Sequence, residues 1–438
     1  MATHAPEIIP KSQRPTRVRY WVIFFSVTLA IFSYIDRVAL SRAAPNVQAD
    51  LHLTKQQFGW VLSAFVTCYA LFEIPSGYLG DRLGPRSVLL RIVLWWSFFT
   101  FATGRAWNFA SIFICQALFG MGEAGCFPNI TKSLSIWLPQ EEKVRAQGII
   151  WLFARWGGAF TPLLVVTLMQ YVSWRTAFAL FGCLGLVWAA AFYWWFRDDP
   201  HDNPHVNAAE RELIASSRKL AGHAPVPWGK LVTAPRAWLL CLQYFSLSFS
   251  WYFYITWLPT YMDEHLKVKL SESVWLNALP LFLGGLGSFF CGQSARFIAK
   301  KLGGIGKERR LMSITGFIGA SILIFTATQL NDPVAVMFTI GFASFCNDLA
   351  MPPSWGAAMD LGGRFAGTLA GAMNMVGNLG GSLAAFTIPW MLTLSNNNWN
   401  VPLYVASVVY MTGALIWMAL DPVTPLDLGH SDLEPQHA

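Results

Sequence analysis

Twelve long apolar segments dominate this 438-residue chain. A helix needs about 20 mostly apolar residues to cross the hydrocarbon core of a bilayer. Charged residues make up 13% of the chain, against about 25% in an average soluble protein. The sequence therefore predicts an all-α membrane protein with twelve transmembrane helices in contact with lipid. The predicted spans are residues 18–41, 56–79, 86–105, 109–130, 145–170, 174–196, 236–262, 272–297, 309–329, 332–356, 366–394 and 400–420.

Basic residues are divided unevenly between the two sides of these segments. If the N-terminus is cytoplasmic, the cytoplasmic connections hold 22 of the 31 lysines and arginines, and the opposite connections hold six. Cytoplasmic loops of membrane proteins carry such an excess. We therefore interpret the net charge of +7 as a topology signal and predict no nucleic-acid partner. Both termini are expected in the cytoplasm, with the first segment kept as an uncleaved span.

One polar insertion divides the chain into two halves of six segments, a pattern that matches two helical bundles related by an axis along the membrane normal. A short amphipathic helix is expected in this insertion, around Ala208–Leu220. The predicted organisation is a cytoplasmic tail at 1–17, an N-terminal six-helix bundle at 18–197, a cytoplasmic linker at 198–235, a C-terminal six-helix bundle at 236–421 and a cytoplasmic tail at 422–438.

Ionised side chains occur inside segments that otherwise suit lipid. Asp36 and Arg37 are adjacent in the first segment, Glu123 lies in "FGMGEAGCF" and Arg155 lies in "WLFARWGGAFTP". A charge at the bilayer centre costs roughly 2.5–3.5 kcal/mol on insertion scales. Such residues face a bundle interior or a water-filled cavity and mark functional sites. We therefore expect these four side chains to share a cavity between the two halves.

The stretch "GYLGDRLGPR", Gly77–Arg86, follows the second segment. It resembles the signature G-x-L-x-D-R-x-G-x-R, which the major facilitator superfamily carries in its cytoplasmic loop between spans 2 and 3. The resemblance implies that the acid and the basic residues lock the two halves together on the cytoplasmic side. The expected gate residues are Gly77, Asp81, Arg82, Gly84 and Arg86, with the glycines permitting close approach and a turn.

Further stretches narrow the resemblance. "SYIDRVALSRAAP", "FGWVLSAFVTCYALFEIPSGYLGDRLG", "GMGEAGCFPNITKSLSIWLP" and "GTLAGAMNMVGNLGG" are similar to the anion:cation symporter family, which includes bacterial sugar-acid transporters such as the galactonate transporter. The resemblance implies proton-coupled import of a small organic anion, in the bacterial inner membrane. It assigns proton coupling to Asp36 and Glu123, and substrate contacts to Arg37, Tyr69 and Asn374.

One position departs from that family. Many relatives carry an arginine seven residues before the span 4 acid, and here the position holds Gln116. A substrate-binding cation is therefore missing from its usual place, although Gln116 stays a candidate contact. We hypothesise that Arg155 supplies the missing cation, since it is the other arginine in apolar surroundings.

The chemistry of an anion carrier fits these residues. Guanidinium stays charged and holds a carboxylate through two parallel bonds. A buried carboxylate nearby releases that cation when protonated and competes for it when ionised. Asp36 is expected to pair locally with Arg37. Glu123, without an adjacent cation in the sequence, is the better proton carrier of the two.

Other residues of the spans receive secondary assignments. Tyr254, in the aromatic span 7, and Trp355, after a pair of prolines expected to break span 10, are candidate cavity contacts. Glu73 is interpreted as a neutral polar contact. Asp348 and Asp360 are interpreted as structural, paired with Arg364 or a loop base.

Three alternatives remain at this point. The chain is a proton-coupled importer, a uniporter or exchanger of an organic anion or neutral solute without proton coupling, or a membrane enzyme or receptor-like binding protein. The sequence has no nucleophile–base constellation or Walker-type loop, so the third class is not favoured. The seven cysteines fall inside spans without metal-ligand spacing. No metal or cofactor is predicted, and a monomer is expected.

Overall fold

The computed structural model describes residues 14–215, 226–268 and 274–427. Its N-terminal half contains α1 (Arg19–Arg42), α2 (Ala44–Asp50), α3 (Lys55–Leu83), α4 (Pro85–Thr103), α5 (Phe109–Glu123), α6 (Cys126–Trp137), α7 (Gln140–Met169) and α8 (Trp174–Trp195). The connecting segment contains the 3-10 turn η1 (Pro200–Asp202), α9 (Ala208–Ala215) and α10 (Trp228–Thr233). The C-terminal half contains α11 (Pro235–Tyr252), the π-helical turn η2 (Phe253–Trp257), α12 (Leu258–Glu264), α13 (Val274–Leu302), α14 (Ile305–Ala327), α15 (Pro333–Leu349), α16 (Met351–Gly362), the 3-10 turn η3 (Gly363–Phe365), α17 (Ala366–Leu394) and α18 (Asn400–Ala419).

Nine stretches of the described chain are long and apolar enough to cross a membrane. One of them, Pro333–Leu394, is 62 residues long and contains two spans, α15 with α16 and then α17. The remaining two of the twelve predicted spans are α4, which includes Arg86 and Arg91, and α11, which is rich in serine and aromatic residues. The twelve-helix prediction is therefore confirmed.

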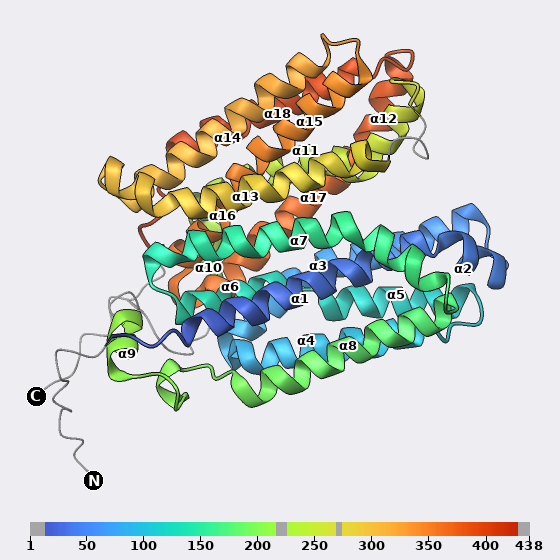
Figure 1. The fold of residues 1–438 in the computed structure, drawn as a ribbon. Coiled ribbons are helices and arrows are strands. Elements are labelled where there is room, and N and C mark those ends of the chain that lie inside the picture. The colour runs from blue at the N-terminus through green and yellow to red at the C-terminus, as the bar shows by residue number, and fades with distance from the viewer. Residues whose placement is uncertain (1–13, 216–225, 269–273, 428–438) are drawn as a thin grey trace, which may run out of the picture.

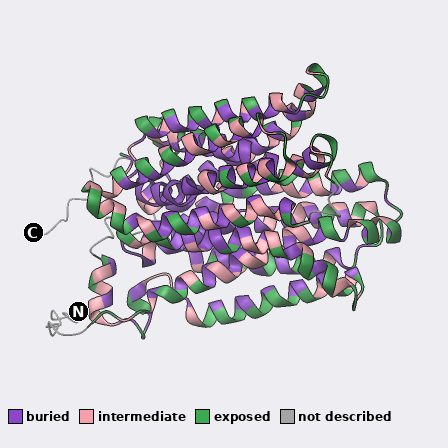
Figure 2. Cartoon of the chain, turned by 45° about the horizontal axis from the view of Figure 1, so that its top comes forward, coloured by how far each residue is buried: buried purple, intermediate pink, exposed green. Residues whose placement is uncertain are grey.

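The two halves lie side by side, one built from α1–α8 and the other from α11–α18 (Figure 1). Helix α7 packs against α13 and α16, and α3 packs against α17, so these helices form the seams between the halves. We name the end where α1 begins and α18 ends the linker end, and the end that carries α2 and α12 the far end (Figure 1). Figure 2 shows buried residues through the middle of the bundle and exposed ones along its outer helices.

The fourth span of each half is interrupted near its middle. Helix α5 ends at Glu123 and α6 begins at Cys126, with Gly125 at φ 81°, a left-handed conformation that favours glycine. Helix α15 ends just after Asp348, and α16 begins beside Pro352 and Pro353. The expected break at the prolines is confirmed. Each break directly follows a buried acid, which places Glu123 and Asp348 at corresponding positions of the two halves.

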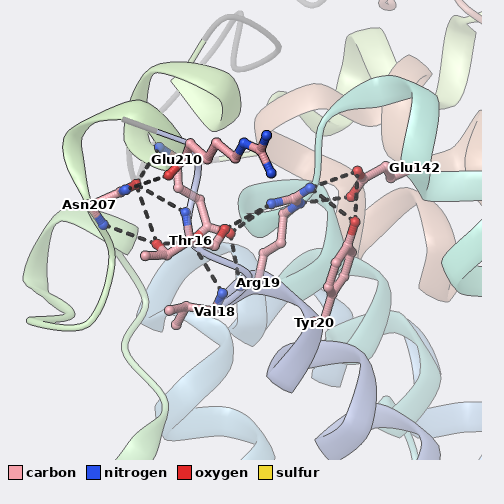
Figure 3. Close-up of polar contacts among 8 residues, drawn as sticks. Thr16, Val18, Arg19, Tyr20, Glu142, Asn207 and Glu210 are labelled. Carbon is pink, nitrogen blue, oxygen red and sulfur yellow. Dashed lines mark hydrogen bonds and ion pairs between the residues drawn. The ribbon is translucent and has the colours of Figure 1, made fainter. Parts of the chain in front are cut away.

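The segment that joins the halves is hydrogen-bonded to the start of the N-terminal half through Asn207 and Glu210. Glu210 of α9 accepts hydrogen bonds from the backbone N–H groups of Val18 and Arg19, at the otherwise unsatisfied start of α1. The Arg19 guanidinium lies between Glu210 and Glu142 of α7, at 2.8 Å from each (Figure 3). These contacts connect α9 to both α1 and α7.

Some sequence predictions lie partly outside the described residues. The amphipathic helix expected over Ala208–Leu220 is present as α9 up to Ala215, and residues 216–225 are outside the described chain. Most of the predicted tails at 1–17 and 422–438 also lies outside it. All seven cysteines are free thiols.

Candidate functional site

Helices α1 and α5 bring Arg37 and Glu123 together inside the N-terminal half. Arg37 Nε donates to Glu123 Oε1 at 2.9 Å, and the hydroxyl of Ser33, one turn earlier on α1, donates to the same oxygen. The Glu123 side chain is fully buried, whereas 22% of the Arg37 side chain is exposed. Arg37 Nη2 and Glu123 Oε2 have no partner among the described residues. The ion pair therefore keeps unused hydrogen-bonding capacity at both of its ends.

The expected local pair between Asp36 and Arg37 is wrong. Side chains at neighbouring helix positions point about 100° apart around the axis, because a helix has 3.6 residues per turn. Arg37 turns toward Glu123, and Asp36 makes no ion pair in the part of the chain that the structure describes. Asp36 is nevertheless buried, at 7% exposure, so a carboxyl group without a cationic partner stands one residue from the ion pair.

A second group of polar residues joins the two halves beside Arg37. The Arg37 guanidinium lies over the Tyr69 ring, 4.2 Å from its centroid. Asn374 of α17 approaches from the other half and donates through Nδ2 to the Tyr69 hydroxyl at 3.4 Å and to Glu73 Oε1 at 2.6 Å. The three residues that the family resemblance assigns to substrate contact, Arg37, Tyr69 and Asn374, thus form one cluster.

Arg155, by contrast, already has a carboxylate partner. Its Nε and Nη2 donate to the two Asp348 oxygens at 2.7 and 3.0 Å, in a bidentate ion pair between α7 and α15. Both side chains are almost fully buried, and the guanidinium lies 3.3 Å from the centroid of the Trp251 ring. Asp348 therefore pairs across the halves and not with Arg364 or a loop base. To bind an anionic substrate, Arg155 would have to release the Asp348 carboxylate and pair with the anionic group of the substrate.

Tyr34 links the two arginine centres. Its ring lies 5.8 Å from the Arg37 Cζ, and its hydroxyl lies 3.5 Å from Arg155 Nη1. Aromatic side chains from both halves pack around it: Phe127 stacks on Trp151, and Trp355 contacts both of those rings. Trp355 is fully buried and donates its indole N–H to the Tyr244 hydroxyl at 3.2 Å. Trp355 thus belongs to the aromatic layer that separates the two arginines.

Two predicted contact residues lie away from this cluster. Gln116 donates to the Thr103 hydroxyl at 3.0 Å within its own half and has no contact with Arg37 or Glu123 among the described residues. Tyr254 pairs its hydroxyl with that of Tyr410 at 3.1 Å, inside the C-terminal half. Tyr254 lies in the π-helical turn η2 and packs edge-on against Trp251, the aromatic residue that contacts Arg155. Tyr254 therefore packs against the Trp251 ring that contacts Arg155.

The acid of the predicted gate motif joins the two halves at the linker end. Asp81 accepts hydrogen bonds from the backbone N–H groups of Gly367 and Thr368, at the start of α17 in the other half. Helix N-termini carry free N–H groups and a partial positive charge, so a carboxylate suits this position. Lys132 of α6 forms an ion pair with Asp81 at 3.0 Å and donates to the backbone oxygen of Arg364.

The basic residues of the motif do not cross between the halves, which corrects the expectation for Arg82 and Arg86. Arg82 is exposed and, among the described residues, donates a hydrogen bond to the Tyr78 hydroxyl on its own helix. Arg86 lies over the Tyr193 ring at the end of α8, 4.7 Å from its centroid. The start of α17 is itself positive, so it attracts the acid and not the two cations. Gly84 makes the expected turn, at φ 85°.

Closure of this seam depends on the absence of a side chain at Gly77. A Cβ there would overlap the Gly367 carbonyl oxygen on α17. We expect Gly77→Ala to destabilise the sealed linker end by about 1–3 kcal/mol, the usual cost of overpacking. That shifts the conformational equilibrium about 5- to 150-fold toward the open seam. Cysteine labelling from the linker side in membrane vesicles measures the shift.

The matched control is Gly59→Ala on the same helix, because a Cβ at Gly59 meets nothing within 4 Å. Equal labelling of the two variants would show that the close approach at Gly77 does not limit closure.

Sequence reasoning missed several partners in these clusters. Ser33 and Tyr34 carry no charge and were not predicted as contacts, although both lie within about one turn of Arg37 on α1. Asp348 and Lys132 did carry a signal in the sequence, because each has an ionisable side chain in or beside a predicted span. Asp348 lies inside predicted span 10, and Lys132 lies just after predicted span 4. A pairing search restricted to buried charges would have included Arg155–Asp348.

Asp360 pairs with bases of the predicted connections, which is one of its two predicted alternatives. It accepts from Lys143 of α7 at 2.8 Å and from Arg309 of α14 at 2.6 Å, and not from Arg364. It is therefore structural, as expected, and adds a further contact between the halves at the linker end.

Comparison with known proteins identifies the family to which this twelve-helix chain belongs. The Major Facilitator Superfamily model matches residues 26–385. The "Probable sulfoacetate transporter SauU" of Cupriavidus necator is 30% identical over 414 residues, covering 94% of this chain and 96% of that protein. The "D-galactonate transporter" of Escherichia coli is 26% identical, covering 94% and 98%. The structure of the proton:xylose symporter XylE has a TM-score of 0.75 at 11% identity, covering 94% of this chain and 98% of the other, and so shares the fold. The chain belongs to the major facilitator superfamily, as a multi-pass membrane transporter and not an enzyme.

Proposed function

We propose that this chain imports a small organic anion, a sugar acid or another small carboxylate or sulfonate, together with protons. The observation that carries the proposal is the buried ion pair of Arg37 and Glu123, which puts a fixed cation and a protonatable group in direct contact. An anionic substrate is further supported by relatives named for sulfoacetate and D-galactonate.

Competition for Arg37 is the proposed coupling step. Ionised Glu123 holds the guanidinium through Nε, while Nη2 has no partner among the described residues. Protonation of Glu123 removes its charge and leaves Arg37 to bind the substrate through parallel N–H···O bonds. Tyr69 and Asn374, which adjoin Arg37, are placed to contact the rest of the substrate. The proton and the anion then both stabilise the state in which Glu123 is protonated and Arg37 holds the substrate. Each ligand therefore raises the affinity for the other, which couples their transport.

The positive residues at the linker end support a cytoplasmic orientation for that end. In this orientation the contacts of Asp81, Asp360 and Gly77 seal the protein toward the cytoplasm. The anion would then reach Arg37 from the far end. We propose that the protein works in this way as a monomer in the bacterial inner membrane.

Uptake into proteoliposomes tests the proposal. We expect sulfoacetate, D-galactonate or D-glucuronate to be taken up, with the rate raised severalfold by an inward proton gradient and returned to the basal rate by a protonophore. Glu123→Gln, which cannot ionise, should transport with a weaker stimulation by the gradient than the wild-type protein. Equal rates with and without the gradient in the wild-type protein would favour a uniporter or exchanger, and uptake of neutral sugars alone would exclude an anion carrier.

A further inference from the structure

Glu73 is a carboxylic acid on the seam between the halves that the coupling scheme above does not use. It lies on α3, one turn from Tyr69 toward the linker end, and its side chain is 0% exposed. Helix α17 closes over it: a Cβ at Gly371 would lie 2.7 Å from the Glu73 carbonyl oxygen. Glu73 is thus enclosed as long as α3 and α17 stay packed together.

The hydrogen bonding of Glu73 is incomplete. Oε1 accepts from Asn374 Nδ2 at 2.6 Å, whereas the equally buried Oε2 has no partner among the described residues. Glu73 also forms no ion pair in the part of the chain that the structure describes, and Arg37, the cation that acts on it, is paired with Glu123. The groups beside the Glu73 carboxyl are neutral: the Asn374 amide and the Tyr69 hydroxyl.

The surroundings contain little that would stabilise a negative charge. The titratable groups close enough to act on Glu73 are Tyr69 of α3, Arg37 of α1, Glu123 of α5, Cys126 beyond the break in span 4, and Tyr252 of α11. Arg37 is the one cation in this set, and Glu123 already neutralises it. Burial of an ionised carboxylate without its own counterion is far more costly than burial of a neutral acid.

We propose that Glu73 is a further proton-binding residue of this transporter, protonated while the α3–α17 seam is closed and deprotonated when that seam opens. Asn374 and Gly371 both belong to α17 of the other half. Separation of the halves therefore removes the amide and the packed helix surface together and admits water to Glu73. The O–H bond then breaks, the proton passes to water and the carboxylate remains hydrated. This role rests on the proposed proton coupling and adds one proton to each transport cycle.

Infrared spectroscopy of the purified protein tests the protonation state without any substrate. Glu73→Gln keeps an oxygen acceptor for Asn374 and the same side-chain shape but cannot ionise. We expect the difference spectrum between wild type and Glu73→Gln to contain the C=O stretch of a protonated carboxylic acid. Glu73→Asp, which keeps an acid, should retain such a band at a shifted frequency, and it provides the comparison if the glutamine variant yields no folded protein. Ionised carboxylate bands in its place would overturn the proposal.

Proton stoichiometry tests the role in transport. Proteoliposomes loaded with a pH-sensitive dye report protons moved per anion for sulfoacetate, D-galactonate and D-glucuronate, with Glu123→Gln measured in parallel. We expect Glu73→Gln to move one proton fewer per anion than wild type and to keep anion uptake. An unchanged ratio beside a coupled wild type would overturn the role of Glu73 alone. A wild type that moves anion without protons would overturn the proposed coupling, while the infrared result still decides the protonation of Glu73.

Discussion

Replacing Arg37 with glutamine should reduce anion uptake about 30-fold or more. The substitution removes the cation proposed to bind the substrate and leaves Glu123 buried without its partner. Truncating one partner of a buried, hydrogen-bonded charge pair costs about 2–5 kcal/mol. Arg37→Lys should recover only part of the activity, because an ammonium keeps the charge but loses the planar fork. Initial uptake rates in proteoliposomes measure both variants.

Two comparisons separate a binding defect from misfolding. The double variant Arg37→Gln with Glu123→Gln removes the uncompensated carboxylate, so its thermal stability in detergent should recover while uptake stays absent. Arg91→Gln is the matched control, since Arg91 is an exposed arginine inside the α4 span, away from the Arg37–Glu123 pair. Substantial uptake by Arg37→Gln would contradict the assignment of Arg37 to the substrate.

Replacing Asp348 with asparagine should destabilise the protein by about 3–5 kcal/mol, the usual cost of removing one partner from a buried ion pair. Arg155 would then remain charged between α7 and α15, with the Trp251 ring as its main neighbour. Arg155→Gln should have a similar effect, because it leaves Asp348 uncompensated. Thermal unfolding in detergent measures the loss, and the exposed pair Arg296–Glu141 provides a control expected to contribute about 1 kcal/mol or less.

The double variant Arg155→Gln with Asp348→Asn decides what the pair does. Removing both charges is much less costly than removing one, so this variant should be more stable than either single change. If Arg155 supplies the substrate cation that Gln116 cannot, the double variant folds without transporting. If the pair only joins the halves, uptake returns with stability, and the substrate-cation hypothesis for Arg155 is wrong.

The fold was predictable from sequence because its signals are local. Spans follow from runs of apolar residues, the break in span 10 follows from Pro352 and Pro353, and the turn at Gly84 follows from a motif. Each of these depends on residues that are neighbours in the chain. Some residues of the candidate site were also predictable from sequence. A charged side chain inside a span is costly enough to indicate a function wherever it occurs.

The pairing of charges was not predictable, because it depends on helix rotation and on the distance between spans. Asp36 and Arg37 are adjacent in sequence and still point to different neighbours, whereas Arg37 meets Glu123 from 86 residues away. Arg155 meets Asp348 from the other half of the molecule. Tyr254 lies in the π-helical turn η2, and its hydroxyl meets that of Tyr410 inside the C-terminal half, a partner that the sequence of span 7 does not indicate. Such relations appear only once the helices are packed.

The contact of Asp81 with α17 has a consequence for how such proteins diversify. Asp81 accepts from two main-chain N–H groups and from the Thr368 hydroxyl, and Gly367 leaves no room for a side chain, so this contact depends on the first residues of α17 and not on the rest of the helix. Farther along the same helix, Asn374 faces the arginine cluster. Mutations can therefore alter ligand preference on one part of α17 while its first turn keeps closing the barrier.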